Sequence, residues 1–250
     1  MSVLARFHAI DENQKASVVR KLMEYSTPDF DYFYLIGLSL LMATFGLLMD
    51  SAAIVIGSML IAPLMYPILG VSLGLVMSNY SVLGRSLHTL GKSLGGGLVL
   101  STAGAFFFGD EMMYHTAEVM SRTEPNTLHF FVAVVAGAAV AYVLARPEWS
   151  DTLPGVAISV ALIPPLATIG IGLAALDPVI IKGASVILAL NIVGIVAVAT
   201  VIFLLMNLAE KQQIAVSTIK KEEEKLVEQK RAMDEIDDNF QADSPTNNTN

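Results

Sequence analysis

The residues best suited to contact a solute lie inside two long apolar segments, where polar atoms have few competing partners. Each segment contains prolines near its middle, and a proline removes a backbone N–H, so that a carbonyl oxygen of the preceding turn loses its helical partner. In lipid, such an oxygen is tolerated only where protein groups or water satisfy it. Nearby hydroxyl, phenol and amide side chains can hydrogen-bond that oxygen or a bound solute. The candidate solute-binding residues are Ser58, Pro63, Tyr66, Pro67, Ser159, Pro164, Pro165, Thr168 and Asn191.

These assignments have a purely structural alternative. Prolines are also expected where two kinked helices pack closely, with small residues such as Gly70 and Gly74 at the contact. Asn191, near the middle of an apolar run, either contacts a solute or a freed carbonyl, or forms an ordinary hydrogen bond between helices. Such a bond contributes about 1 kcal/mol or less in a membrane. Both interpretations stay open on the sequence alone.

Charged residues near the ends of the apolar segments are the candidate pathway entrance. Asp50 and Asp151 each precede a hydroxyl residue at the start of a proline-containing segment. An acid there either caps the helix or captures a cation. Arg85, His88 and Lys92 are spaced i, i+3 and i+7, which places them on one face of a helix. That stripe either attracts an anionic solute or anchors the helix at the cytoplasmic surface.

The sequence predicts no enzyme, metal site or cofactor. The chain has no cysteine and only four histidines, which are scattered. It contains no His-Glu-x-x-His, no phosphate-binding P-loop and no Gly-x-Ser-x-Gly. The net charge of −8 does not indicate a nucleic-acid partner, and 10 of the 23 acids lie beyond Leu208.

Composition indicates an all-α integral membrane protein with the lipid bilayer as its surroundings. Hydrophobic residues make up 54% and charged residues 15% of the chain, and the mean hydropathy is +0.61. A membrane-spanning helix needs about 20 apolar residues. We expect helices at about 30–49, 82–109, 128–145 and 180–208, the first of them an uncleaved membrane helix, and proline-broken segments at about 51–77 and 153–176.

The order of helix, broken segment and helix occurs twice. Leu60-Ile61-Ala62-Pro63-Leu64 is matched by Leu162-Ile163-Pro164-Pro165-Leu166, and Gly70 and Gly172 follow at the same distance. Because each unit has three crossings, an odd number, the second unit has to lie upside down relative to the first. The sequence therefore predicts six transmembrane segments as two inverted repeats, about 29–109 and 128–208, joined by a polar link.

Charge distribution favours this topology with both termini in the cytoplasm. It puts every lysine and arginine on the inside except Arg122 and Lys182. Re-entrant hairpins at the broken segments would instead put Arg85, Lys92 and Arg146 outside. Short loops near the membrane carry their positive residues on the cytoplasmic side, so six crossings of the cytoplasmic membrane are expected.

The two ends of the chain are expected in the cytoplasm. Residues 1–28 form an arm whose helical pattern puts Val18, Val19, Leu22 and Met23 on one side. The arm either lies along the membrane surface or is partly ordered. Residues 209–250 are expected to form a charged helix with a disordered tail. Apolar residues recur every seven positions from Ile219, but without a second apolar row, so a solvated helix is favoured over self-association.

Two runs of the sequence resemble a known family. They are Thr44–Gly70 and Val160–Leu173, each containing one of the proline motifs given above. They are similar to the bacterial and archaeal hydrophobic membrane proteins grouped as domain of unknown function 389, and the resemblance covers about 30–208. Family members often have asparagine where this chain has Asp50, and many carry an extra soluble domain before the membrane part. The family has no agreed activity, so the resemblance implies class and architecture and no site residue.

The sequence favours a transporter or channel for a small solute or ion, with its pathway between the inverted repeats. Broken helices expose bare carbonyls near the middle of the membrane, as transport sites require. The alternative is a membrane-embedded scaffold or sensor that presents its charged C-terminal helix to a partner. An intramembrane enzyme acting on lipid would need a buried acid–base or nucleophile pair, which we do not find. The small-residue pair Gly91 and Gly95 indicates a homo-oligomer.

Overall fold

The computed structural model describes residues 12–25, 29–144, 152–221, 224–225 and 227–228, and for residues 152–160 it describes the backbone alone. These residues contain helices and no β-strand. The α-helices are α2 (Glu12–Tyr25), α3 (Phe30–Leu48), α4 (Ala52–Met59), α5 (Met65–Val76), α6 (Tyr80–Phe108), α7 (Ala117–Met120), α8 (Thr127–Leu144), α9 (Thr152–Ala175) and α10 (Pro178–Leu205). Two short 3-10 helices are η1 (Met113–His115) and η2 (Leu208–Lys211).

Three described helices are long and apolar enough to cross a membrane: α3, α8 and α10. The expected all-α membrane class is confirmed at this level, because these helices indicate membrane association. The 24 residues of α9 would extend about 36 Å at the usual helical rise.

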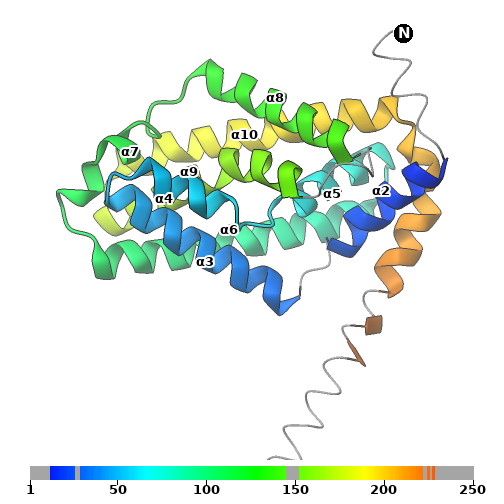
Figure 1. Ribbon diagram of the computed structural model, residues 1–250, viewed down its shortest axis with the longest axis horizontal. Helices are drawn as coiled ribbons and strands as arrows, with labels where there is room; N and C mark the ends of the chain where they lie inside the picture. The colour runs from blue at the N-terminus through cyan, green and yellow to red at the C-terminus, as the bar shows by residue number, and fades with distance from the viewer. Residues whose placement is uncertain (1–11, 26–28, 145–151, 222–223, 226, 229–250) are drawn as a thin grey trace, which may run out of the picture.

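The long helices lie side by side along the longest axis of the molecule (Figure 1). The link between α6 and α8 lies at one end, and α2 lies at the other. In the link, the Thr116 hydroxyl donates to the Leu47 carbonyl at 2.7 Å, and His115 Nε2 lies 3.3 Å from Asp177 Oδ2. The link therefore joins the end of α3 to the start of α10.

The break expected in the first proline segment is confirmed. Helix α4 ends at Met59 and α5 begins at Met65, with residues 60–64 outside any helix. The Ser58 carbonyl, at the end of α4, accepts from the Ile61 N–H at 3.2 Å and from the Ser39 hydroxyl at 2.7 Å. Helix α3 thus supplies a side-chain donor where the helical hydrogen bonds stop.

The second proline segment has no break, so the prediction of a break there is wrong. Helix α9 continues from Thr152 to Ala175 with Pro164 and Pro165 inside it. Two consecutive prolines remove only two of the backbone donors of the helix. The remaining backbone hydrogen bonds keep α9 helical, because a donor from another helix replaces one of the two that are lost. Helix α10 supplies that donor, as described below.

Three helix–helix turns share one backbone design. In each, a residue with positive φ follows the first helix, and the next residue donates its N–H to a glycine carbonyl five positions earlier, as in a Schellman motif. The turns are Gly46–Ser51, Gly74–Asn79 and Gly172–Asp177, with φ of 53°, 49° and 54° at Asp50, Ser78 and Leu176 and N···O distances of 2.9, 3.1 and 2.9 Å.

The glycine at each turn allows the second helix to approach closely. A Cβ on Gly74 would lie 2.7 Å from the Leu83 backbone nitrogen, and one on Gly172 would lie 3.0 Å from the Ile181 nitrogen. The sequence pairs Gly172 with Gly70, but the structure gives the equivalent role to Gly74. The proline motif of the first segment lies four residues further from its turn than the motif of the second segment does. A glycine at the same distance from both motifs is therefore Gly70 in the first segment, which is not the glycine of the turn.

The N-terminal helix α2 packs against protein. Its four predicted apolar residues are all buried, and α2 contacts α5 and η2. The Glu12 carboxylate binds Lys15 Nζ at 2.8 Å and Lys211 Nζ at 2.5 Å. Residues 12–25 are therefore ordered as a helix that packs on protein, and their position relative to the membrane surface stays a prediction.

The chain after η2 is helical over residues 212–221, as expected, but it is not fully solvated. Ala215, Thr218 and Ile219 are buried. The later positions of the seven-residue repeat, from Leu226 on, lie outside the described residues.

Candidate functional site

The centre of α9 has a carbonyl group whose helical donor is missing. In a helix the N–H of residue 165 would donate to the carbonyl of Ala161, and proline has no N–H. The Asn191 amide nitrogen, on α10, donates to the Ala161 oxygen at 2.6 Å. Asn191 is 5% exposed, and Pro164 and Pro165 are buried. The Asn191 bond therefore joins α10 to α9 and is made to a freed carbonyl, and contact of Asn191 with a solute stays a prediction.

A hydroxyl group of α6 reaches the same stretch of α9 and is joined to a hydroxyl of α3. The Ser101 hydroxyl on α6 lies 3.0 Å from the Ala167 carbonyl oxygen and 2.7 Å from the Thr44 hydroxyl on α3. The Thr44 hydroxyl in turn lies 2.7 Å from the Leu40 carbonyl. Two hydroxyl protons are available for three contacts, so two of the three are hydrogen bonds at any one time. These contacts join α3, α6 and α9 in the buried interior.

Gly170 makes the contact between α6 and α9 possible. A Cβ on Gly170 would lie 2.3 Å from the Ser101 Oγ and 3.0 Å from the Thr102 nitrogen. Within α9, the Thr168 hydroxyl donates to the Pro164 carbonyl at 2.9 Å. Three carbonyls near the prolines, those of Ala161, Pro164 and Ala167, thus have a side-chain partner.

The first proline segment lies beside α9. Helices α4 and α5 both contact α9, and Figure 1 shows the three together. Ser58 is buried, and its hydroxyl donates to the Val55 carbonyl at 2.6 Å. Pro67 is buried, whereas Pro63 and Tyr66 are half-buried. The predicted solute-binding residues that the structure describes therefore lie on neighbouring helices or, for Pro63, in the break between α4 and α5. The side chain of Ser159 lies outside the described residues.

Asp50 does not cap the segment that follows it. The N-cap residue of α4 is Ser51, which makes no side-chain cap bond. Asp50 is exposed in the left-handed conformation that ends α3, and its Oδ1 accepts from the Glu118 N–H at 2.8 Å. The expected capping role is therefore wrong, because the turn directs this carboxylate to the link. Asp151 lies outside the described residues.

The Arg85, His88 and Lys92 stripe lies on the outer side of α6. His88 and Lys92 are exposed and Arg85 is half-buried. On the same helix, a Cβ added to Gly91 or Gly95 would meet no described atom of another element within 4 Å. The opposite face of α6, with Ser101, is the one that packs inward. The homo-oligomer expected from Gly91 and Gly95 stays a prediction.

The described residues contain hydrogen-bonding groups at the site and no metal-binding cluster. Among them, every buried side-chain nitrogen or oxygen has a partner, and no group of three acids or histidines is placed to hold a metal ion. Outside the spanning helices, the Val179 N–H and, to a lesser extent, His115 lower the pKa of Asp177. The chemistry offered at the centre of α9 is therefore hydrogen bonding by amide, hydroxyl and carbonyl groups.

Sequence reasoning missed Ser39, Thr44 and Ser101, whose hydroxyls form hydrogen bonds from α3 and α6 to neighbouring helices. A usable signal was present, because each is a hydroxyl residue within an otherwise apolar run, where its proton needs a partner. Their partners were not predictable, since these are backbone carbonyls and hydroxyls on other helices.

The model of the family described as domain of unknown function DUF389 matches residues 59–197. The chain belongs to the DUF389 family. The matched region contains Ala161, Pro164, Pro165 and Asn191. The chain is also 30% identical over 166 residues to an uncharacterised protein of Methanocaldococcus jannaschii, an alignment covering 66% of this chain and 51% of that protein. The chain thus spans about half the length of the relative it matches. No solved structure matches it.

Proposed function

We propose that this DUF389 protein carries a small solute or ion across the cytoplasmic membrane, without enzymatic activity. Its path would run between two inverted repeats of three membrane-crossing segments each, with both termini in the cytoplasm. The observation that carries the proposal is the Asn191–Ala161 hydrogen bond, which places an exchangeable polar pair in the buried interior of an apolar helix bundle.

The packing of the helices supports two related units. Helix α3 contacts α4 and α6, and α8 correspondingly contacts α9 and α10. Helix α5 contacts α6 as α9 contacts α10, and both pairs are joined by the same glycine turn. The link, between the units, lies at the opposite end from α2 (Figure 1). These relationships are those expected if the units cross the membrane in opposite directions.

The geometry suggests how a solute would be held. The Ala161 carbonyl can accept from only a few donors at once, and Asn191 occupies it in this conformation. A cation or a hydrogen-bond donor on the solute would replace the amide at the oxygen, and the amide oxygen and the Ser101 and Thr44 hydroxyls would supply further acceptors. The adjoining break at residues 60–64 gives the neighbouring segment a place to bend. We therefore favour a cationic or donor-rich solute.

Flux into liposomes that contain the purified full chain tests this function. A panel of Na⁺, K⁺ and small polar amines is compared for the wild type, Asn191→Leu and Thr200→Val. Thr200 is the matched control because it lies on the same helix and bonds only its own Val196 carbonyl at 2.7 Å. We expect Asn191→Leu to lower flux about tenfold or more and Thr200→Val to leave it within about twofold. Absence of flux for every solute in the panel would count against transport.

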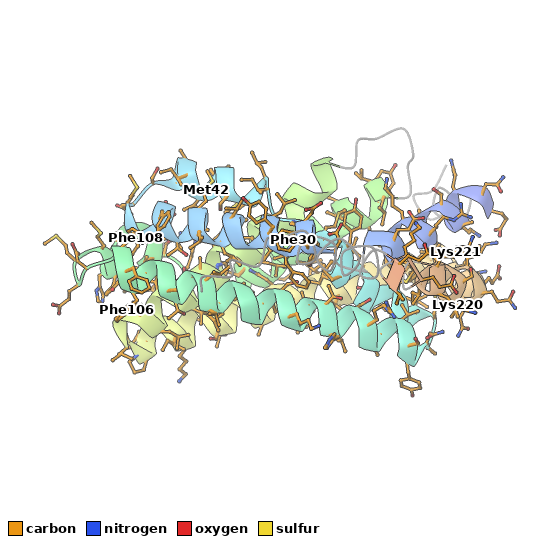
Figure 2. All side chains as sticks on the ribbon, turned by 90° about the horizontal axis from the view of Figure 1, so that it is seen from below. Phe30, Met42, Phe106, Phe108, Lys220 and Lys221 are labelled. Carbon is orange, nitrogen blue, oxygen red and sulfur yellow. The ribbon has the colours of Figure 1, made fainter. Side chains whose placement is uncertain are left out.

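A scaffold or sensor role is the second candidate, favoured by the charged helix after η2. Lys220 and Lys221 on this helix are exposed at the end of the molecule (Figure 2). Because residues 212–221 are partly buried, the informative deletion removes residues 222–250 and keeps the packed part. Loss of the cellular phenotype with unchanged flux in liposomes would favour the sensor.

A further inference from the structure

A cavity of about 470 Å³ lies between α2 and the helix that follows η2. Three basic residues line it, Arg20, Lys221 and Lys225, together with the hydroxyl residues Ser217 and Thr218 and one acid, Glu24. The cavity is separate from the centre of α9, and the transport proposal makes no use of it. Figure 2 shows Lys221 where the first helix and the chain after η2 meet.

Helical spacing directs these side chains to one place. Residues 217, 218 and 221 lie on one face of the helix that follows η2, and Arg20 and Glu24 are spaced i and i+4 on α2. Lys225 also lines the cavity. Arg20 and Lys221 alone bring two positive charges to the lining against the one negative charge of Glu24. An anion entering it would meet a net attraction, with the two helices as walls.

The hydroxyl groups can turn towards a ligand at little cost. Ser217 and Thr218 both donate to the carbonyl of Ile214, at 3.0 and 2.8 Å. Because that carbonyl has two hydroxyl donors, one hydroxyl can rotate to a bound oxygen and the carbonyl keeps the other. Arginine and lysine with hydroxyl donors form the charge-assisted bonds that phosphate oxygens accept.

The walls are held in place before any ligand binds. Glu12 joins α2 to η2 through Lys211 Nζ at 2.5 Å, and Val19 and Leu22 of α2 are fully buried. A site whose walls are already fixed loses less conformational entropy on binding than one that must form around its ligand.

We propose that this cavity binds a phosphate group. Its volume is in the range of small-molecule sites and exceeds the needs of inorganic phosphate alone. A phosphate with an attached organic group therefore fits it better. The group can come from a phospholipid headgroup or from a soluble phosphate compound, because the cavity lies at the end of the molecule where α10 ends.

Titration of the purified full chain tests the proposal. Pyrophosphate is titrated by calorimetry into the protein in nanodiscs of neutral phosphatidylcholine, and thermal unfolding is compared in nanodiscs with and without phosphatidylglycerol. Saturable pyrophosphate binding identifies a soluble source, and a higher unfolding midpoint with phosphatidylglycerol identifies a lipid source. Either result supports the site. No saturable binding and no difference between nanodiscs overturns it.

Variants decide whether the effect belongs to this cavity. Lys221→Gln should weaken binding about tenfold, the value of one charge-assisted hydrogen bond. Lys220→Gln is the matched control, because it removes the same charge one residue away, outside the lining. Glu24→Gln should tighten binding about two- to fivefold by removing a repulsive charge, and this gain cannot result from misfolding. Equal losses for Lys220→Gln and Lys221→Gln, or no gain for Glu24→Gln, would overturn the assignment.

Discussion

The Asn191 amide nitrogen lies 2.6 Å from the carbonyl oxygen of Ala161, the residue four positions before Pro165. This is the carbonyl that Pro165 deprives of its helical donor. A side chain on α10 thus replaces a backbone hydrogen bond missing from α9. The same pair explains why α9 stays helical across two prolines and why a polar residue is present inside an apolar helix.

Replacing Asn191 by leucine should destabilise the folded protein by about 1–3 kcal/mol, because the buried Ala161 carbonyl loses its donor. Thr200→Val, on the same helix, should cost less than about 1 kcal/mol. Reversible denaturation in detergent measures both changes. Equal losses of unfolding free energy for the two variants would show that the Asn191 bond stabilises the protein no more than the Thr200 bond does.

Adding Pro165→Ala to Asn191→Leu should restore most of that stability. Alanine returns the N–H that α9 lacks at this position, so the Ala161 carbonyl regains a helical partner. Alanine also has a higher helix propensity than proline, by about 3 kcal/mol in a helix interior. If the double variant is as unstable as Asn191→Leu alone, the stabilising effect of Asn191 does not come from replacing the N–H that Pro165 lacks.

Gly170→Ala should destabilise the protein by about 1–3 kcal/mol, the usual result of overpacking. The new Cβ would lie 2.3 Å from Ser101 Oγ and 3.0 Å from the Thr102 backbone. Gly84→Ala is the control, since an added Cβ there meets no described atom of another element within 4 Å. It should be neutral or stabilising, because alanine favours a helix over glycine. A neutral Gly170→Ala would mean that α6 and α9 do not need this close approach.

The Glu12 ion pairs should give α2 a pH-dependent attachment. Lys15 and Lys211 lower the pKa of Glu12 from 4.5 to about 2. A carboxyl whose pKa is lowered on folding adds stability above its unfolded pKa and loses it as pH falls through the folded value. The difference in unfolding midpoint between wild type and Glu12→Gln should therefore be full at pH 6 and smaller at pH 3. A difference that does not change between these pH values would contradict the ion pairs.

Membrane topology is testable on a chain with no cysteine of its own. Single cysteines at Glu124 in the link and at Ser81 at the start of α6 are probed with an impermeant thiol reagent on intact cells. We expect labelling of Glu124→Cys from outside and of Ser81→Cys only after permeabilisation. Labelling of Ser81→Cys on intact cells would favour re-entrant hairpins at the proline segments and would contradict the inverted repeats.

The sequence predicted the positions of the helices well, because their apolar length is a strong signal. It also found the break between α4 and α5 and the buried face of α2. It failed at Pro164 and Pro165, where a broken helix was expected. Whether the helix breaks at these prolines depends on whether a donor from another helix reaches the Ala161 carbonyl. That contact cannot be predicted from the neighbouring residues in the sequence.

The candidate site was predicted less completely than the fold. Asn191 and Thr168 are found at the prolines, as expected, but Ser101 and Thr44 were missed. Capping was one of two interpretations of Asp50, and it is wrong because the left-handed conformation of Asp50 brings its carboxylate to the Glu118 N–H. The left-handed conformation of Asp50 is set by the turn that begins at Gly46. It is difficult to predict from the sequence, because residues other than glycine adopt it infrequently.

The most direct test of the transport proposal is solute flux through the Pro165→Ala/Asn191→Leu double variant in liposomes. The double variant keeps the Ala161 carbonyl paired and the helix intact, and it removes the exchangeable amide. We predict a protein that has regained most of the wild-type stability and has at least about tenfold lower flux. A stable double variant with wild-type flux would show that the Asn191–Ala161 pair only holds the helices together, and the proposed site would have to be abandoned.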